Sequence, residues 1–310
     1  MKVFLTGASG LVGSAVARAA FRRGHRVVGV VGTYAGDIEG AEKTLALDLT
    51  DEAAVSAAVL EAFPDAIFNC AAVSVPEVCD TDPARAQTLN VTLPATLARL
   101  AHHLSARFVH LSSEQIFDGE RPTPYASGDA PSPINLYGRQ KLASEREVHA
   151  ATEDFAVTIR APLLMGDSLG GRRSVHERLF ADWAAGKAPK LYVDELRQPC
   201  TAENLAEVMV ELGERRDLRG VFHWAGTELL SRHALGEKIR AHFKLTDKQA
   251  PLVAITRAET PEAAKRRPPS LGLDIAPLAG KLKTRPQSIT EQLEALKVPP
   301  PCREWFLKQG

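Results

Sequence analysis

The chain has 310 residues, of which 38 are basic and 38 are acidic, so its formal net charge is zero at pH 7. This length allows two domains, or one large α/β domain with a smaller lobe attached. Apolar residues make up 45% and charged residues 25%, which is typical of globular proteins and excludes disordered, collagenous and coiled-coil chains. The charge balance argues against broad binding to nucleic acids or anionic membranes, which a basic surface would favour.

The four cysteines are scattered along the chain. Cys70, Cys79, Cys200 and Cys302 form no CxxC pair and have no histidine at metal-ligand spacing. No metal site is predicted, and the pattern is typical of reduced thiols in a cytosol. No stretch approaches the roughly 20 apolar residues of a membrane span. We therefore expect a cytoplasmic protein that binds neither membranes nor nucleic acids.

Short β-branched or apolar runs alternate with helical patterns through the first 165 residues. Six strands are predicted, at Val3–Thr6, Val27–Val31, Leu45–Leu47, Ala66–Asn69, Phe108–Leu111 and Val157–Arg160. Helices are predicted between them at Gly10–Arg23, Ala53–Phe63, Ala84–Leu104 and Leu136–Ala150. This alternation indicates βαβ units, so we predict an α/β fold with a doubly wound parallel sheet of the Rossmann type.

After about residue 165 this alternation breaks. A loop is expected at Gly166–Arg173 and a strand at Val221–Trp224. Helices are expected at Val175–Ala185, Thr201–Gly213 and His233–Phe243, and a last one after the capping-box sequence Ser288–Glu291. We predict a dinucleotide-binding Rossmann domain over residues 1–165 and a smaller substrate-binding lobe over residues 166–310, with some elements of the lobe returning to the main sheet.

The glycine-rich segment Gly7–Gly13 stands between the first predicted strand and the first predicted helix. Gly7 permits a tight turn, Gly10 lets backbone N–H groups approach a pyrophosphate, and Gly13 lets the helix pack closely on the sheet. The N-terminus of the helix adds the positive end of its dipole. The segment predicts a dinucleotide site, with a tight turn that binds nothing as the alternative. The predicted cofactor contacts here are Gly7, Ser9, Gly10, Leu11, Val12 and Gly13.

The second predicted strand ends at Val31 without the acidic residue that would hold the ribose hydroxyls of NAD. Because no carboxylate would repel a 2′-phosphate, the sequence favours NADP, although no arginine follows at once and NAD stays open. Thr33 follows this strand and is a candidate cofactor contact. Asp48, next to Leu49, is expected either to accept a hydrogen bond from the adenine amino group or to cap the following helix.

A phenol and an ammonium, Tyr137 and Lys141, are four residues apart on one face of a predicted helix. We expect the ammonium to stabilise phenolate and so lower the pKa of Tyr137, which would allow acid–base chemistry near neutral pH. Lys141 is also expected to reach ribose hydroxyls. Ser113 ends a predicted strand at the sheet edge where α/β proteins bind ligands, and it is expected to donate to a substrate carbonyl oxygen.

Together these motifs resemble the extended short-chain dehydrogenase/reductase superfamily, and within it the dTDP-4-dehydrorhamnose reductase-like branch. The matching segments are Thr6–Gly13, Asp48–Leu49, Asn69–Ala72, Asn90–Val91, His110–Ser113, Phe117–Gly119, Pro133–Gly138, Lys141 and Arg160. The resemblance implies a catalytic triad of Ser113, Tyr137 and Lys141. It also adds Cys70, Ala71, Ala72 and Pro162 to the expected cofactor contacts. The implied activity is NAD(P)-dependent reduction of a keto group on a nucleotide-activated deoxysugar, with Tyr137 as proton donor.

One departure from the branch lies beside the expected catalytic hydroxyl. The branch usually has Asp-Tyr there, whereas this chain has Glu114–Gln115, so Glu114 joins Ser113 as a candidate substrate contact. Arg197 is a further candidate, for a substrate diphosphate, with a solvated surface arginine as the alternative. His110 lies within an apolar strand and is expected to be a core histidine whose polar atoms are hydrogen-bonded, and not a base.

Other functions stay open. The chain also resembles the regulatory beta subunit of methionine adenosyltransferase, which binds NADP and docks to a catalytic partner. Pro299–Phe306 is then a candidate docking segment, with packing of this tail on its own domain as the alternative. A sugar-nucleotide epimerase is a third interpretation. The sequence leaves open whether the protein forms a homo-oligomer.

Overall fold

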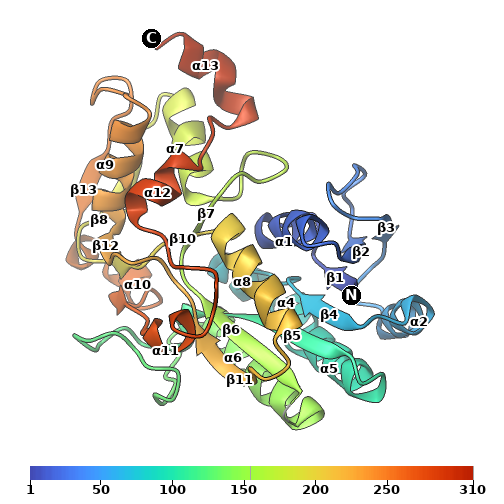
Figure 1. The fold of residues 1–310 in the computed structure, drawn as a ribbon. Helices are drawn as coiled ribbons and strands as arrows, with labels where there is room; N and C mark the ends of the chain where they lie inside the picture. The colour runs from blue at the N-terminus through green and yellow to red at the C-terminus, as the bar shows by residue number, and fades with distance from the viewer. Residues whose placement is uncertain (154, 310) are drawn as a thin grey trace.

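A computed structural model describes residues 1–153 and 155–309, and its main sheet has seven parallel strands (Figure 1). Their order across the sheet is β11-β6-β5-β4-β1-β2-β3. The strands are β1 Lys2–Thr6, β2 Arg26–Val31, β3 Lys43–Ala46, β4 Ala66–Asn69, β5 Arg107–Ser113, β6 Ala156–Ala161 and β11 Gly220–His223. The predicted doubly wound sheet is confirmed. Its strand order reverses between β1 and β4, so their carboxyl ends border the crevice in which such sheets bind ligands.

Helices cover both faces of this sheet. On one face α1 (Leu11–Arg22) packs against α8 (Ala202–Glu214), and their apolar side chains form one buried cluster with the sheet. On the other face lie α2 (Glu52–Ala62), α5 (Leu93–His103) and α6 (Leu136–Thr152), which enclose a second cluster. Both β11 and α8 come from the C-terminal half of the chain, whereas the division into domains at residue 165 stays a prediction.

The long helix predicted over residues 84–104 is confirmed, but it is not a regular α-helix along its whole length. The chain forms α3 (Pro76–Thr81), α4 (Pro83–Gln87), a π-helical turn at Thr88–Thr92 and then α5. Pro94 lies in the first turn of α5, has no backbone N–H, and its ring clashes with the carbonyl four residues earlier, which belongs to Asn90. The wider π turn at Asn90 avoids this clash.

Short strands and helices form a lobe above the sheet, at the upper left of Figure 1. Its strands are β7 Leu164–Met165, β8 Lys190–Tyr192, β9 Leu196–Arg197, β10 Cys200–Thr201, β12 Leu230–Ser231, β13 Val253–Ile255 and β14 Ser270–Leu271. Its helices are α7 Val175–Ala184, α9 Arg232–His242, α10 Pro261–Ala264, α12 Ile289–Glu294 and α13 Arg303–Leu307, whereas α11 Ala276–Ala279 packs beside β11 of the main sheet. The capping box predicted at Ser288 is confirmed at the start of α12.

The C-terminal tail packs on this lobe. Trp305 and Phe306 in α13 each lie 6.0 Å from the ring centre of Phe180 in α7, and Phe306 lies 6.2 Å from Phe243. The candidate docking segment therefore packs on its own domain, as the alternative interpretation predicted. Within residues 1–153 and 155–309, no helix is both long and apolar enough to cross a membrane, and no cluster of His, Cys, Asp or Glu could hold a metal ion.

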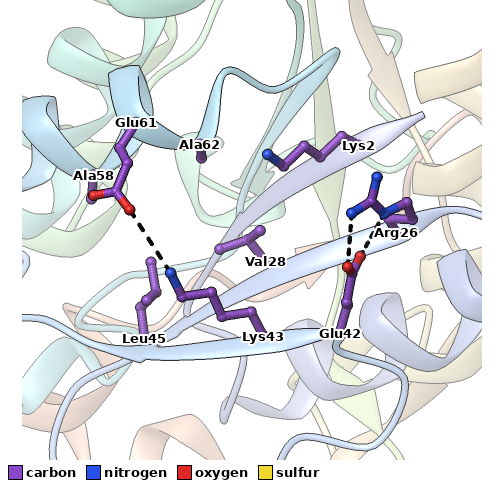
Figure 2. A pocket seen from close by; sticks show the side chains of 9 residues that line it. All are labelled: Lys2, Arg26, Val28, Glu42, Lys43, Leu45, Ala58, Glu61 and Ala62. Atoms are coloured by element: carbon purple, nitrogen blue, oxygen red, sulfur yellow. Dashed lines mark hydrogen bonds and ion pairs between the residues drawn. The ribbon is translucent and has the colours of Figure 1, made fainter.

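A pocket of about 200 Å³ lies at the amino ends of three strands (Figure 2). It is lined by Lys2, Arg26, Val28, Glu42, Lys43, Leu45, Ala58, Glu61 and Ala62. Two ion pairs cross it, Arg26–Glu42 at 2.7 Å and Lys43–Glu61 at 3.9 Å. Because doubly wound sheets bind ligands at the carboxyl ends of their strands, the functional site is expected at the opposite edge.

Candidate active site

The glycine turn after β1 has the shape that a pyrophosphate requires. Gly7 has a φ of +68°, and its carbonyl accepts the N–H of Gly10 at 2.8 Å. A Cβ on Gly13 would lie 2.1 Å from the Gly7 carbonyl oxygen, so only glycine fits there. Helix α1 begins with no side-chain cap and no acidic residue in its first turn. Its first N–H groups, which include those of Leu11 and Val12, are therefore available to an anion.

The other predicted cofactor contacts follow three different strands. Thr33 is exposed in the loop after β2, Cys70, Ala71 and Ala72 are half-buried after β4, and Pro162 is buried after β6. A Cβ on Gly7 would lie 2.8 Å from the backbone nitrogen of Ala71, so the glycine turn and the end of β4 adjoin. The carboxyl ends of β1 and β4 thus adjoin, and those of β2 and β6 lie at the same edge of the parallel sheet, although contact with a cofactor stays a prediction.

Asp48 does not cap a helix. Its Oδ1 accepts hydrogen bonds from the backbone N–H of Thr50 at 2.9 Å and from the Thr50 hydroxyl at 2.8 Å, which lower the pKa of the carboxyl. The cap of α2 is Asp51, which accepts the N–H of Ala54 at 2.9 Å. The capping prediction for Asp48 is therefore wrong, because the helix begins three residues further on. Its role at adenine stays a prediction, and neighbouring Leu49 is half-buried.

The three residues of the expected triad lie at the same edge of the sheet. Ser113 is the last residue of β5, and Tyr137 and Lys141 lie in the first two turns of α6. Asn135 caps α6 by accepting the N–H of Gly138 at 2.8 Å, which sets the start of the helix and hence the position of Tyr137. Ser113 is 7%, Tyr137 9% and Lys141 2% exposed. A hydrogen bond with Ser113 acts on the Tyr137 phenol.

The expected lowering of the Tyr137 pKa is wrong for this structure. Burial raises the pKa of Tyr137 to about 12, and the hydrogen bond with Ser113 only partly opposes it. Lys141 Nζ donates instead to the carbonyl of Leu111 at 2.5 Å. Burial also lowers the pKa of Lys141 to about 8, because an ammonium is poorly solvated there. Tyr137 therefore keeps its proton at neutral pH, which is the state that a proton donor requires.

Glu114 and Arg197, predicted separately as substrate contacts, are paired with each other. Glu114 Oε1 lies 3.3 Å from Arg197 Nε, and both side chains are at most 4% exposed. Arg197 also lies 3.3 Å from Glu195, which accepts hydrogen bonds from Arg267 at 2.7 and 3.2 Å. The alternative of a solvated surface arginine is therefore wrong. The sequence analysis did not single out Glu195, although it lies two residues from Arg197, and it could not indicate Arg267, which lies 72 residues from Glu195 along the chain.

A doubly wound sheet, a glycine turn after β1 and a Ser–Tyr–Lys group at the carboxyl edge define the extended short-chain dehydrogenase/reductase class. Within that class the chain matches the RmlD substrate binding domain family over residues 1–297. It belongs to this family.

Two relatives and one solved structure indicate the range of proteins that the chain is similar to. It is 31% identical to the probable low-salt glycan biosynthesis reductase Agl14 of Haloferax volcanii, over 96% of this chain and 97% of the relative. It is 32% identical to methionine adenosyltransferase 2 subunit beta of Xenopus laevis, over 89% and 81%. It shares its fold with dTDP-4-dehydrorhamnose reductase of Bacillus anthracis in complex with NADP, with a TM-score of 0.80, 21% identity and coverage of 94% and 96%.

Proposed function

We propose that the protein is an NADP(H)-dependent reductase that acts on the keto group of a nucleotide-activated sugar. The observation that carries this proposal is that Ser113, Tyr137 and Lys141 lie at the carboxyl edge of the sheet, the same edge at which the glycine turn follows β1. Similarity to Agl14, a probable reductase in glycan biosynthesis, supports the same activity. NAD is the alternative cofactor, and the chain's lack of an acidic residue at the end of β2 favours NADP.

Each of the three residues would have a separate role in the reduction of a carbonyl group. Bound NADPH would supply the hydride that adds to the carbonyl carbon. The Ser113 hydroxyl would donate a hydrogen bond to the carbonyl oxygen and so stabilise the negative charge that develops on it. Tyr137 would donate its proton to the same oxygen, for which its protonated state at neutral pH is suited. Lys141 would hold the ribose of the cofactor and assist reprotonation of the phenol.

A cationic cavity in the lobe supports a sugar nucleotide as the substrate. This cavity of about 310 Å³ is lined by Val175, Arg178, Leu179, Asp182, Pro189, Lys190, Leu191 and Arg232. Three cations and one acid face it, and burial together with neighbouring arginines lowers the pKa of Arg232 to about 10. An anion such as a diphosphate would relieve this surplus of positive charge, and the apolar residues would suit a base.

Buried ion pairs connect this cavity to the expected catalytic residues. Arg232 lies 3.9 Å from Glu195, which pairs with Arg197, which in turn pairs with Glu114 directly after Ser113. A substrate that spans the cavity and the crevice would place its phosphates in the lobe and its keto group at Ser113. Glu114 and Arg197 are proposed to border the sugar between these two points.

The test is oxidation of NADPH by the purified protein with a panel of 4-keto sugar nucleotides. We expect wild-type turnover with at least one of them, and loss of that turnover by at least a thousandfold in Tyr137→Phe, with the affinity for NADPH retained. Tyr125→Phe is the matched control, because the Tyr125 hydroxyl bonds Asp118 and Gly119 away from the triad. Full activity in Tyr137→Phe would exclude the mechanism.

A second candidate function is that of a cofactor-binding regulatory subunit. The 32% identity to methionine adenosyltransferase 2 subunit beta favours it, at a level similar to the identity with Agl14. The packing of Trp305 and Phe306 on Phe180 removes the segment that the sequence offered for docking. Binding of NADPH without turnover of any keto sugar nucleotide, together with a stoichiometric complex with an adenosyltransferase, would favour this second function.

A further inference from the structure

A hydrogen-bonded histidine lies beneath the expected triad. His110 in β5 is fully buried, and both ring nitrogens have partners, as predicted for a core histidine. Its Nδ1 lies 3.2 Å from Asn69 Nδ2, and its Nε2 lies 3.0 Å from Ser144 Oγ. The positions of the protons on these atoms follow from the groups at the two ends of the chain of hydrogen bonds.

One end of this series of hydrogen bonds is the backbone carbonyl of Lys141, which can only accept a hydrogen bond. Ser144 Oγ donates its proton to that carbonyl at 2.7 Å. Since Ser144 has one proton, its oxygen must accept from the ring of His110, so Nε2 carries the histidine proton. Nδ1 is then bare and accepts from the Asn69 amide nitrogen. A neutral imidazole protonated on Nε2 is the one form that satisfies both contacts.

The other end is the backbone N–H of Ala71, which can only donate. Because the Asn69 amide nitrogen faces His110, its Oδ1 faces Thr6, whose hydroxyl donates to it at 2.6 Å. The Thr6 oxygen accepts the Ala71 N–H at 3.4 Å. Each contact in the series therefore pairs a donor with an acceptor, and the series has one direction, from Ala71 through His110 to Lys141.

This series of hydrogen bonds connects the elements that the proposed function uses. Thr6 directly precedes Gly7 of the glycine turn, Ala71 follows β4 beside that turn, and Lys141 belongs to the expected triad. Burial, and then the charge of Lys141, hold the pKa of His110 well below its usual range, so the ring stays neutral. A second proton on the ring would face the Asn69 amide nitrogen, donor to donor, and break the series.

We propose that His110 is a positioning residue, whose neutral ring couples the glycine turn to the backbone at Lys141 through this directed series of hydrogen bonds. This inference rests on the proposed function for its catalytic consequence. Loss of one link would release the backbone from which the Lys141 side chain extends, so turnover would fall while most of the fold is retained. Because the links act as one unit, loss of a second link would add little.

The first test concerns the proton and needs no turnover. Nitrogen NMR of histidine-labelled protein should show His110 with a bare Nδ1 and a protonated Nε2 at neutral pH, and the Ser144→Ala variant should lose this single form. A ring protonated on Nδ1, or on both nitrogens, would overturn the inference, whether or not the protein proves to be a reductase.

The second test uses variants at the two ends. Thr6→Val removes the hydroxyl at constant shape, Thr6→Ser retains it, and Ser144→Ala removes the other link. We expect kcat to fall about tenfold in Thr6→Val and in Ser144→Ala, and also about tenfold in the double variant, with recovery in Thr6→Ser. NADPH affinity, measured by titration, should show the same non-additivity. If the two losses of kcat multiply to about a hundredfold in the double variant, or if Thr6→Ser does not recover activity, the inference is overturned. An inactive wild type would instead count against the proposed function, and the NADPH titration would then decide whether the inference about His110 holds.

Discussion

Replacement of Lys141 by methionine should make the cofactor-free protein more stable. Lys141 is 2% exposed, and its ammonium donates to the Leu111 carbonyl at 2.5 Å. Burial is the main cause that lowers the pKa of Lys141, and the nearby carboxylate of Glu145 opposes it only in part. The buried ammonium therefore lowers the stability of the native state, and methionine, which is similar in length and uncharged, would remove this destabilisation.

The size and the pH dependence of this effect follow from the pKa. A fall from 10.5 to about 8 corresponds to about 3 kcal/mol of native-state destabilisation. The variant also loses the hydrogen bond to Leu111, which costs about 1 kcal/mol, so the free energy of unfolding of Lys141→Met should exceed that of the wild type by about 2 kcal/mol at neutral pH. Between pH 8 and pH 10.5 the unfolded chain binds the proton that the native state has lost, so the stability of the wild type rises with pH. The advantage of the variant should therefore shrink in this window.

Urea unfolding at neutral pH and at about pH 9.5, without cofactor, measures this difference. We expect the unfolding free energy of Lys141→Met to exceed that of the wild type at neutral pH, and the gap to approach zero at about pH 9.5. Lys187→Met, at an exposed position, is the control and should change the free energy by less than about 0.5 kcal/mol at either pH. A variant less stable than the wild type at neutral pH, or a gap that is constant with pH, would refute the reasoning.

Two further substitutions test the glycine turn and the buried charges. Gly13→Ala would place a Cβ 2.1 Å from the Gly7 carbonyl oxygen, so the NADPH affinity measured by fluorescence titration should fall at least tenfold. Gly170→Ala is the control, because a Cβ there meets no atom within 4 Å, and this variant should bind NADPH as the wild type does. Arg160→Met would leave the Glu145 carboxylate buried without the arginine that it pairs with at 2.8 Å, so the free energy of unfolding in urea should fall by about 3–5 kcal/mol. Adding Glu145→Leu should restore part of that loss. A loss below about 1 kcal/mol would show that the pair is not desolvated.

Local pattern predicted most of the fold. All seven strands of the main sheet, the glycine turn and the Tyr137–Lys141 spacing depend on neighbours within a few residues, so they can be read from the sequence. The helix predicted over residues 84–104 is present, but its π-helical turn was not predicted; Pro94 restricts the carbonyl of Asn90 one turn earlier. That effect was also local, but helical periodicity alone does not register it.

The sequence by itself determined the order of the elements, the cofactor turn and the residue types at the crevice, because each depends on short-range geometry and on side-chain chemistry. Only the tertiary structure decided how those residues behave. It paired Glu114 with Arg197, and it raised the pKa of Tyr137 where the spacing to Lys141 had indicated a fall. Both outcomes follow from burial, because the free energy of a charge depends on everything that replaces water around it, and those groups come from distant parts of the chain.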